Sequence, residues 1–389
     1  MSSKQHDEHL LTGKDLISEP QARVQKLLDE LVDRGGEHGL QVAVYLDGKL
    51  IVDAWAGIAN DLTKEPVNGD TLFTVYSAGK GLVFTVIHQL TERNMIDYDA
   101  PVSLYWPEFA ANGKENITVR DVLTHRAGIP QMPAGITPEK LTDWDFMAKV
   151  VAELEPLWQP GTKTGYHAFT QGWILGELIR RVDGRTIAQL VRDEISKPLK
   201  IEDLYFGIPE EAEARVARIS GKMPSGGGIQ EDMLINRVIP YGIGPGNEMW
   251  NRSDIRQASI PGAGAIVSAR ALARHYAALS GEGVDGTRLL TPERTRIAAA
   301  LQTAEPDVVM FNSPTRKGLG YWLGESLFPM INNDAVFGHT GSGGSIGFVD
   351  PVNHLALALT KNKLSWGAGN EAAEIRIIRE VYQSLRIPQ

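Results

Sequence analysis

Apolar residues near the start of the chain follow helical and strand periods in turn. Residues 18–36 (SEPQARVQKLLDELVDRGG) carry leucines and valines at helical spacing and end in a glycine pair, which predicts an amphipathic helix. Residues 40–59 alternate apolar and polar positions on both sides of Asp47-Gly48, which predicts a β-hairpin. Residues 71–94 begin as an extended segment and continue as a helix of about four turns.

Helical patterns then dominate from residue 97 to about 278, most clearly over 169–184 and 186–199. Strands at both ends of the sequence with helices between them indicate one sheet built from both termini. The expected fold class is therefore α+β, an α/β sandwich in which an antiparallel sheet is flanked by helices and joined to a mainly helical lobe. The C-terminal strands and final helix are expected at 335–341, 344–350, 354–362 and 369–385.

The length of the chain bounds its domain organisation. With 389 residues it exceeds what one compact core usually needs, so we expect a single domain, 1–389, made of two lobes. Lobe 1, the sheet and its flanking helices, should cover about 19–96 plus 290–389, and the helical lobe 2 about 97–289.

A glycine-rich stretch at 221–250 is long for a simple connection and predicts a lid or a pocket wall. Together with the segment around Trp144, Phe146 and Trp158 it could shape the specificity of a pocket. The same residues could equally be ordinary loop packing, and the sequence leaves both interpretations open.

Composition and charge exclude several classes of protein. A formal charge of −9 disfavours binding to nucleic acid and to anionic membrane surfaces. The chain has no cysteine, which excludes disulfides, thiol catalysis and Cys–Zn sites, and its nine histidines are scattered. No run approaches the ~18 apolar residues of a membrane span, and the polar start MSSKQHDEHLLTGKD shows no secretory signal. We therefore expect a cytoplasmic protein, without metal, whose oligomeric state stays open and includes a homo-oligomer.

The first candidate for chemistry is VYSAGKGLVF, where Ser77 and Lys80 stand at the junction between the extended segment and the helix. A serine hydroxyl needs a neighbouring base to become a nucleophile. A lysine one turn along the helix lies on the same face, about 5–6 Å away between Cβ atoms. Burial and the positive field of a helix N-terminus both lower a lysine pKa. This is the only S-x-x-K in the chain, although the pair could also be surface decoration on a helix.

Two further segments carry candidate groups. Tyr166 follows a Pro-Gly turn and precedes the helix at 169–184, where it could be catalytic or could pack with its hydroxyl bonded to backbone. The stretch FGHTGSGGSIGF could offer a backbone N–H to an oxyanion and the His339 side chain to substrate. It could also be a plain glycine-rich hairpin turn.

Taken together and in order, these segments resemble the serine β-lactamase and penicillin-binding-protein superfamily, and within it most closely the family VIII carboxylesterases, relatives of class C β-lactamases. The resemblance runs from about Glu19 to Leu385 and includes VRDVLTHRAGIP (119–130) and SIPGAGAIVSARALARHYAAL (259–279). It implies no cofactor. It also implies these roles: Ser77 as the acylated serine, Lys80 as the motif lysine, Tyr166 as the motif tyrosine, His339, Thr340 and Gly341 as the substrate-binding triplet, and the backbone N–H groups of Ser77 and Ser342 as the oxyanion hole.

Two positions depart from the β-lactamase pattern. Ala168 stands where class C enzymes have the asparagine of Y-x-N, and His339 replaces the lysine of K-T-G. A histidine with its ordinary pKa of ~6.5 is mostly neutral at pH 7 and is a weak anchor for an anionic substrate. Both departures favour neutral esters over β-lactams and D-Ala peptides.

A competing motif lies at 343–347 (GGSIG), which fits the G-x-S-x-G nucleophile elbow of α/β-hydrolases. That elbow requires a strand-turn-helix, whereas the residues after Ser345 are strand-like. Asp350 and His354 follow in the required order but only four residues apart, too close for separate loops to carry the acid and the base. We therefore predict that Ser345 is not the nucleophile.

The function predicted is that of a serine esterase which hydrolyses short-chain neutral carboxylic esters, a small-molecule substrate, through a Ser77 acyl-enzyme with Lys80 and Tyr166 as its base system. A β-lactamase or DD-peptidase would share the site, and an acyltransferase would differ only in its acceptor. An inactive scaffold that only binds ligands is the remaining alternative, but a scaffold has no chemical need for all three side chains.

Overall fold

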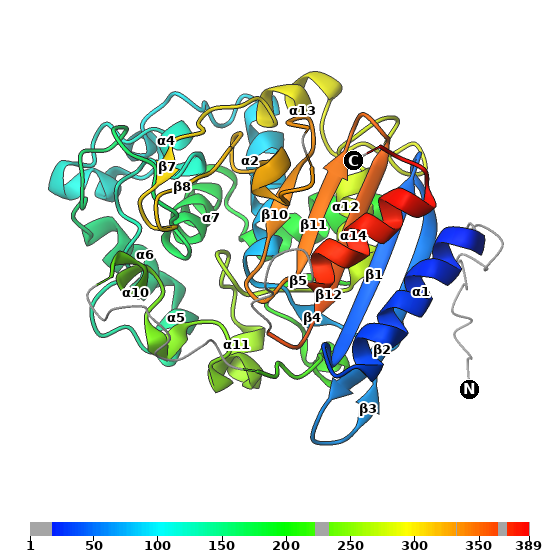
Figure 1. Cartoon of the computed structure of the whole chain (residues 1–389). Coiled ribbons are helices and arrows are strands. Elements are labelled where there is room, and N and C mark those ends of the chain that lie inside the picture. Colours follow the sequence, from blue (N-terminus) through cyan, green and yellow to red (C-terminus); the bar gives the residue numbers. More distant parts are fainter. Residues whose placement is uncertain (1–17, 222–232, 332, 365–371, 389) are drawn as a thin grey trace, which may run out of the picture.

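The computed structural model describes residues 18–221, 233–331, 333–364 and 372–388. Within these residues the main sheet has seven strands in the order β3-β2-β1-β12-β11-β10-β9, and all neighbouring strands are antiparallel. Strands from both ends of the sequence therefore meet at the β1–β12 pair, which confirms the predicted antiparallel sheet (Figure 1). The strands are β1 Gly39–Leu46, β2 Lys49–Asn60, β3 Glu65–Pro66, β9 Trp322–Leu323, β10 Phe337–Thr340, β11 Ile346–Asp350 and β12 Leu355–Lys361.

The β1–β2 hairpin turns at Asp47-Gly48, as the alternation predicts. Both residues have positive φ angles, +48° and +74°, which is the requirement of a two-residue type I′ turn. A Cβ at Gly48 would lie 2.4 Å from the carbonyl oxygen of Gly283, so glycine is required here by contact as well as by conformation.

Helices cover both faces of the sheet. The terminal helices α1 (Ser18–Asp33) and α14 (Ala373–Ser384) lie side by side on one face, and α12 (Ala269–Ala277) packs on the other (Figure 1). Each helix is amphipathic and buries one stripe of apolar residues, for example Val24 and Leu28 on α1. The long predicted helix is α2 (Lys80–Glu92), and its residues from Lys80 to Thr91 are all buried.

Helix α7 (Thr170–Asp183) is drawn on the left of Figure 1 and ends at Gly184 with φ +85°. The boundaries of the two lobes stay a prediction; α12, which we counted with lobe 2, packs on the sheet. The other helices of these residues are α3 Val102–Tyr105, η2 Pro107–Gly113, α4 Val119–Leu123, α5 Pro138–Thr142, α6 Trp144–Glu153, α8 Ile187–Leu190, η3 Val191–Ser196, α9 Lys197–Leu199, η4 Glu210–Arg215, α10 Leu234–Val238, η5 Tyr241–Ile243, η6 Glu248–Asn251 and α11 Ser253–Gln257.

The structure also contains several short strands and helices outside the main sheet and the longer helices. A small antiparallel sheet, β4-β6-β5, joins the segment before Ser77 to residues 265–267, which in turn pair with residues 204–206. None of the helices described is both long and apolar enough to cross a bilayer. The bounds are β4 Phe73–Thr74, η1 Tyr76–Gly79, β5 Leu204–Phe206, β6 Ala265–Val267, α13 Pro292–Ala298, β7 Pro306–Asp307, β8 Ser313–Pro314 and η7 Gly324–Ser326.

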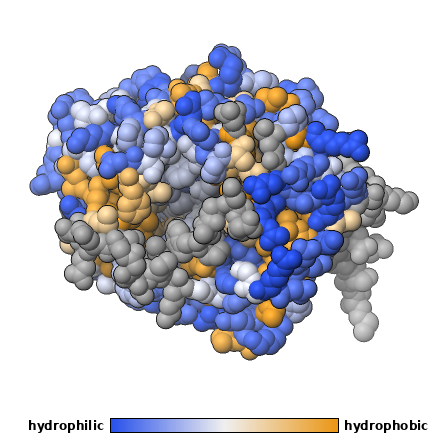
Figure 2. All heavy atoms as spheres, in the orientation of Figure 1, coloured by the Kyte–Doolittle hydropathy of each residue, from blue (hydrophilic) through white to orange (hydrophobic). Residues whose placement is uncertain are grey.

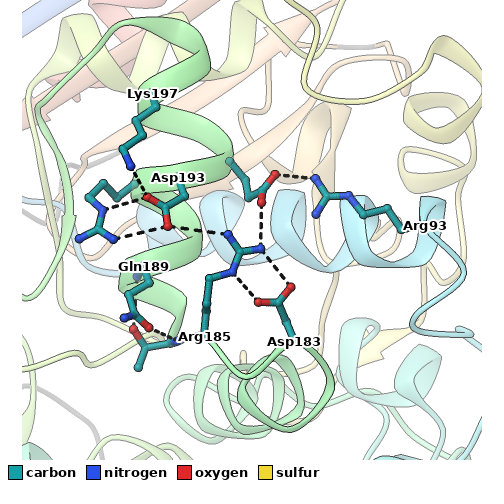
Figure 3. Close-up of polar contacts among 9 residues, drawn as sticks. Arg93, Asp183, Arg185, Gln189, Asp193 and Lys197 are labelled. Carbon is teal, nitrogen blue, oxygen red and sulfur yellow. Dashed lines mark hydrogen bonds and ion pairs between the residues drawn. The ribbon is translucent and has the colours of Figure 1, made fainter.

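An ion-pair network joins the end of α2 to the end of α7 and to η3 (Figure 3). Arg93, just after α2, donates to Glu194 at 2.5 Å, and Arg185 donates to both Glu194 (2.9 Å) and Asp183 (2.6 Å). Single exposed ion pairs contribute only about 0–1 kcal/mol each. The network therefore fixes how the two segments meet more than it stabilises the fold.

Candidate active site

Ser77 is presented by a strained turn. β4 ends at Thr74, the 3-10 turn η1 follows, and α2 begins at Lys80, so the predicted strand-to-helix junction is confirmed. Tyr76, directly before Ser77, has φ +49°, a conformation that is uncommon for a bulky residue and costs energy. Its ring packs edge-on against Trp250 at 5.2 Å, and its hydroxyl accepts a hydrogen bond from the Gly246 N–H at 3.3 Å. These contacts hold Ser77 partly exposed among buried neighbours.

Tyr166 lies directly on the serine. It comes from the loop before α7, and its hydroxyl donates a hydrogen bond to Ser77 Oγ at 2.7 Å. The side chain is buried, and its burial raises the pKa of the Tyr166 phenol. In the free protein the hydroxyl is therefore protonated at neutral pH, close enough to exchange a proton with the serine.

Lys80 is buried beneath the same turn, with 1% of its surface exposed. Its Nζ donates to the carbonyl oxygen of Ala168 at 2.5 Å and to that of Gly262. Burial lowers the pKa of Lys80 to about 7, so a large share of the amine is neutral at physiological pH. Nζ lies 5.7 Å from the centre of the Tyr166 ring, and its hydrogen bonds go to carbonyls rather than to either hydroxyl.

The end of β10 meets the turn that carries Ser77. A Cβ at Gly341 would lie 2.1 Å from the Val75 carbonyl oxygen and 3.1 Å from the Ala78 nitrogen, so only glycine allows this approach. In the part of the chain that the structure describes, the backbone N–H groups of Ser77 and Ser342 have no hydrogen-bond acceptor. Two free donors beside a nucleophile are what an oxyanion hole requires.

His339 lies under the site rather than in its opening. Its side chain is fully buried beside the rings of Tyr166 and Trp322, with Trp322 5.0 Å away between ring centres. Nδ1 donates to the Thr340 carbonyl oxygen at 2.6 Å, and Nε2 has no partner among the described residues. Burial, assisted by the charge of Lys80, lowers the pKa of His339 to about 3, so the ring is neutral.

The structure thus brings Ser77, Lys80 and Tyr166 together, with Gly341 and Ser342 beside them. Thr340 is partly exposed next to this group, whereas the ring of His339 does not reach the surface. The roles of these residues stay predictions, and direct substrate contact by His339 would need the buried ring to move.

Sequence reasoning missed a buried ion pair that anchors Tyr166. Asp307 Oδ1 accepts the Tyr166 N–H at 2.9 Å and two further backbone N–H groups at 3.0 Å. Asp307 Oδ2 accepts from Lys317 Nζ at 2.8 Å, and Nζ also donates to the Thr164 hydroxyl at 3.1 Å. Both charged side chains are 0% exposed. The surrounding sequence has no periodic pattern that would reveal a buried pair ten residues apart.

Two histidines complete the support of Tyr166. The His125 ring lies 4.9 Å from the Tyr166 ring, and its Nδ1 accepts the His167 N–H at 3.1 Å. His167 Nε2 accepts the Ile129 N–H at 3.1 Å while Nδ1 donates to the Gly165 carbonyl at 2.6 Å. Burial lowers the pKa of both rings, that of His167 to about 4. His125 belongs to the segment 119–130, which the family resemblance includes but to whose residues it assigns no role.

Replacing Asp307 by asparagine should lower the free energy of unfolding by about 3–5 kcal/mol, because it leaves the Lys317 charge buried and unpaired. The amide oxygen can still accept the three N–H groups. Urea unfolding followed by circular dichroism measures the loss. Asp334→Asn, which breaks an ion pair with Arg316 at the surface, should cost no more than about 1 kcal/mol. Equal losses in the two variants would contradict a special role of the buried pair.

Ser345 occupies a structural position. It precedes strand β11 and not a helix, is 2% exposed, and its Oγ accepts the Lys361 N–H at 3.3 Å. Asp350 accepts hydrogen bonds from the following turn and, at 3.0 Å, from the Tyr382 hydroxyl on α14. These contacts agree with the prediction that Ser345 is not a nucleophile.

The predicted pocket wall is only partly described, because residues 222–232 lie outside the described residues. Trp144 donates its Nε1–H to Glu177 and packs on Trp173, which is core packing. Trp158, in contrast, lies against Gly165 and 6.3 Å from the His167 ring, next to Tyr166. Figure 2 shows hydrophobic residues gathered over the region where Figure 1 places α6 and α10. A role of this surface in specificity stays a prediction.

Comparison with known proteins agrees with this geometry. The β-lactamase family model matches residues 24–381. The esterase/β-lactamase LipL of Mycobacterium tuberculosis is 37% identical over 346 residues, which cover 84% of this chain and 77% of LipL. A penicillin-binding-protein homologue from Caulobacter crescentus has a TM-score of 0.85 at 32% identity, covering 95% of this chain and 98% of its own. A family VIII carboxylesterase has a TM-score of 0.84 at 29% identity with the same coverage.

The fold and the Ser77 site define a serine hydrolase of the β-lactamase type. The chain belongs to the β-lactamase family, and its similarity to family VIII carboxylesterases, expected from the sequence, is confirmed.

Proposed function

We propose that the protein is a carboxylesterase that hydrolyses short-chain, neutral carboxylic esters through an acyl-enzyme on Ser77. The observation that carries this proposal is the 2.7 Å hydrogen bond between Tyr166 and Ser77 above a buried Lys80 with a pKa of about 7. The similarity to LipL and to a family VIII carboxylesterase supports an ester as substrate.

In the proposed mechanism Ser77 Oγ attacks the ester carbonyl as Tyr166 takes its proton. Tyr166 must be a phenolate to accept this proton. A Tyr166 phenolate with a Lys80 ammonium carries the same number of protons as a Tyr166 phenol with a neutral Lys80 amine, so the two arrangements belong to one protonation state of the pair. The oxyanion sits against the N–H groups of Ser77 and Ser342; losing one such donor typically costs ~10²–10³ in rate. Tyr166 then protonates the departing alcohol, and water activated by the same pair releases the acid.

The electrostatics of the site support a neutral substrate. His339 occupies the position of the lysine in the K-T-G triplet, and its pKa of about 3 keeps it uncharged throughout the working range of pH. A carboxylate of a β-lactam would therefore find no cation at this position. Burial makes this imidazole a weaker anchor for an anion than an exposed histidine would be.

Initial rates on p-nitrophenyl acetate, butyrate and octanoate, with nitrocefin alongside, test the proposal. We expect kcat/KM to be highest for acetate or butyrate and the nitrocefin rate to be lower by orders of magnitude. Faster nitrocefin turnover would favour a β-lactamase, a function included in the name of LipL. Formation of a new ester when an alcohol is added would instead favour an acyltransferase.

The pH dependence of ester hydrolysis should follow Lys80. Since only the neutral amine leaves the Tyr166–Lys80 pair able to take a proton, kcat/KM should rise about tenfold per pH unit up to about pH 7 and then level off. The neighbouring rings of His125 and His339 stay neutral and add no second step. Rates measured from pH 5 to 9 check this. In Lys80→Arg, whose guanidinium stays charged, the rise should vanish with most of the activity; a flat wild-type profile would contradict the assignment.

A further inference from the structure

The turn between β10 and β11 carries Ser342, the second predicted donor of the oxyanion hole. The Gly341 N–H donates to the Ser345 carbonyl oxygen at 2.7 Å, and the Gly344 N–H donates to the Gly341 carbonyl oxygen at 3.1 Å. Gly343 and Gly344 have positive φ angles, +85° and +104°. Glycine adopts many conformations at little cost, so this turn is easily deformed. Contacts with other elements must therefore decide where the Ser342 N–H lies.

The turn borders open space on one side. A cavity of about 300 Å³ is lined by Thr340, Gly341 and Ser345, and also by Leu327 and Phe328 from the segment before β10. A segment beside a cavity has few contacts to lose when it moves. Packing on this side therefore does not hold the turn in place.

The residues at the end of β12 and at the start of α14 support the turn. A Cβ on Gly344 would lie 3.3 Å from Lys361 Nζ and 3.1 Å from Glu374 Oε2. A Cβ on Gly343 would lie 2.3 Å from Leu364 Cδ2. Glycine at both positions lets the main chain of the turn lie directly on these side chains. The ammonium of Lys361 is thus one of the groups on which the turn rests.

A buried ion pair holds Lys361. Its Nζ donates to a carboxylate oxygen of Glu37, in the connection between α1 and β1, and the two side chains are 1% and 3% exposed. Loss of one partner from such a pair is costly because it leaves the other charge buried. The pair therefore keeps the ammonium in one place against Gly344.

We propose that Lys361, held by Glu37, is a positioning residue that sets the place of the Ser342 N–H. The inference rests on the acyl-enzyme proposed above and extends it to two residues outside the sequence motifs. The pair acts through the turn at 341–345 and not on the substrate. The Ser342 N–H is needed most when the ester carbonyl becomes tetrahedral. A displaced turn should therefore lower kcat and leave KM nearly unchanged.

Lys361→Met removes the ammonium and keeps a side chain of similar length. We expect kcat on p-nitrophenyl butyrate to fall about 10- to 100-fold, somewhat less than for complete loss of an oxyanion donor, with KM within about threefold of wild type. Lys114→Met is the matched control, because Lys114 is also fully buried and its Nζ donates to the carbonyl oxygens of Ala111 and Leu154 at 2.6 and 2.5 Å. It should keep the wild-type kcat, and equal losses in the two variants would overturn the proposal.

The variant Glu37→Gln and the double variant Glu37→Gln/Lys361→Met test whether the pair acts as a unit. If it does, the double variant loses no more kcat than Lys361→Met alone. Losses that multiply would mean two independent effects and would contradict the pairing. If Lys361→Met does not fold by circular dichroism, the double variant, in which both charges of the pair are gone, replaces it and must show the same loss of kcat.

Butylboronic acid separates this inference from the proposed function. Ser77 Oγ bonds to the boron and gives its proton to the Tyr166–Lys80 pair, and the tetrahedral anion places one hydroxyl in the oxyanion hole whatever the natural substrate. Its Kd, measured by calorimetric titration, should rise in Lys361→Met by the factor by which kcat/KM falls. If the esters are not hydrolysed, the proposed function fails, and the boronate comparison alone decides the inference. An unchanged Kd in Lys361→Met, or no boronate binding by the wild type, overturns it.

Discussion

Replacing Ser77 by alanine should lower kcat on p-nitrophenyl butyrate by roughly 10⁴- to 10⁶-fold, the range expected when a hydrolase loses its nucleophile. The substitution removes one hydroxyl from a partly exposed position, so the fold and the free energy of unfolding should change little. Burst kinetics of p-nitrophenol release should also disappear, because no acyl-enzyme can form.

Ser345→Ala is the matched control for this substitution. It makes the same chemical change at the serine of the G-x-S-x-G stretch, whose hydroxyl accepts the Lys361 N–H in the part of the chain that the structure describes. Its activity should stay within a few-fold of wild type. Activity that survives in Ser77→Ala and is lost in Ser345→Ala would reverse the assignment of the nucleophile.

The second large effect is expected for Tyr166→Phe. Loss of a general base or acid typically lowers kcat by about 10²–10⁴-fold. The phenyl ring can keep the contacts of the tyrosine ring with His125 and Trp322, so stability should fall only modestly. Steady-state kinetics at pH 8, where Lys80 is mostly neutral, measures the loss of the hydroxyl alone.

Tyr321→Phe serves as the control, since Tyr321 is also fully buried and its hydroxyl is bonded to the Thr85 hydroxyl at 2.9 Å, without contact to Ser77. It should retain activity within a few-fold. Full activity of Tyr166→Phe would leave Lys80 as the sole base and would reduce the tyrosine to a packing role.

The sequence predicted those elements whose signal is local. The Asp47-Gly48 turn, helix α2 and strands β10 to β12 each have a periodic or turn-specific pattern, and each is confirmed. Strands of two or three residues, such as β4, β6 and β9, carry too few positions for any period to appear. Their pairing depends on other segments of the chain: β4 pairs with β6, more than 190 residues further on, and β9 pairs with β10 across a connection of about a dozen residues.

The residues of the site also differ in whether a local sequence pattern could predict them. Ser77, Lys80 and Tyr166 could be selected because the spacing of motifs in a known superfamily is preserved. The Asp307–Lys317 pair could not, since burial of two charges is a property of the folded interior and leaves no mark on local sequence. The burial of His339 is likewise invisible in the motif, although it decides the charge of that residue.

Lys80 donates its hydrogen bonds to main-chain atoms and not to side chains. Its acceptors are the main-chain carbonyls of Ala168 and Gly262, so exchanging the residue at 168 leaves the acceptor in place. Position 262 lacks this freedom, because a Cβ there would lie 2.9 Å from the backbone of residues 168 and 169. An exchange of the side chain at residue 168, the position where class C β-lactamases carry asparagine and this chain alanine, therefore keeps one of the two main-chain acceptors that hold the Lys80 amine.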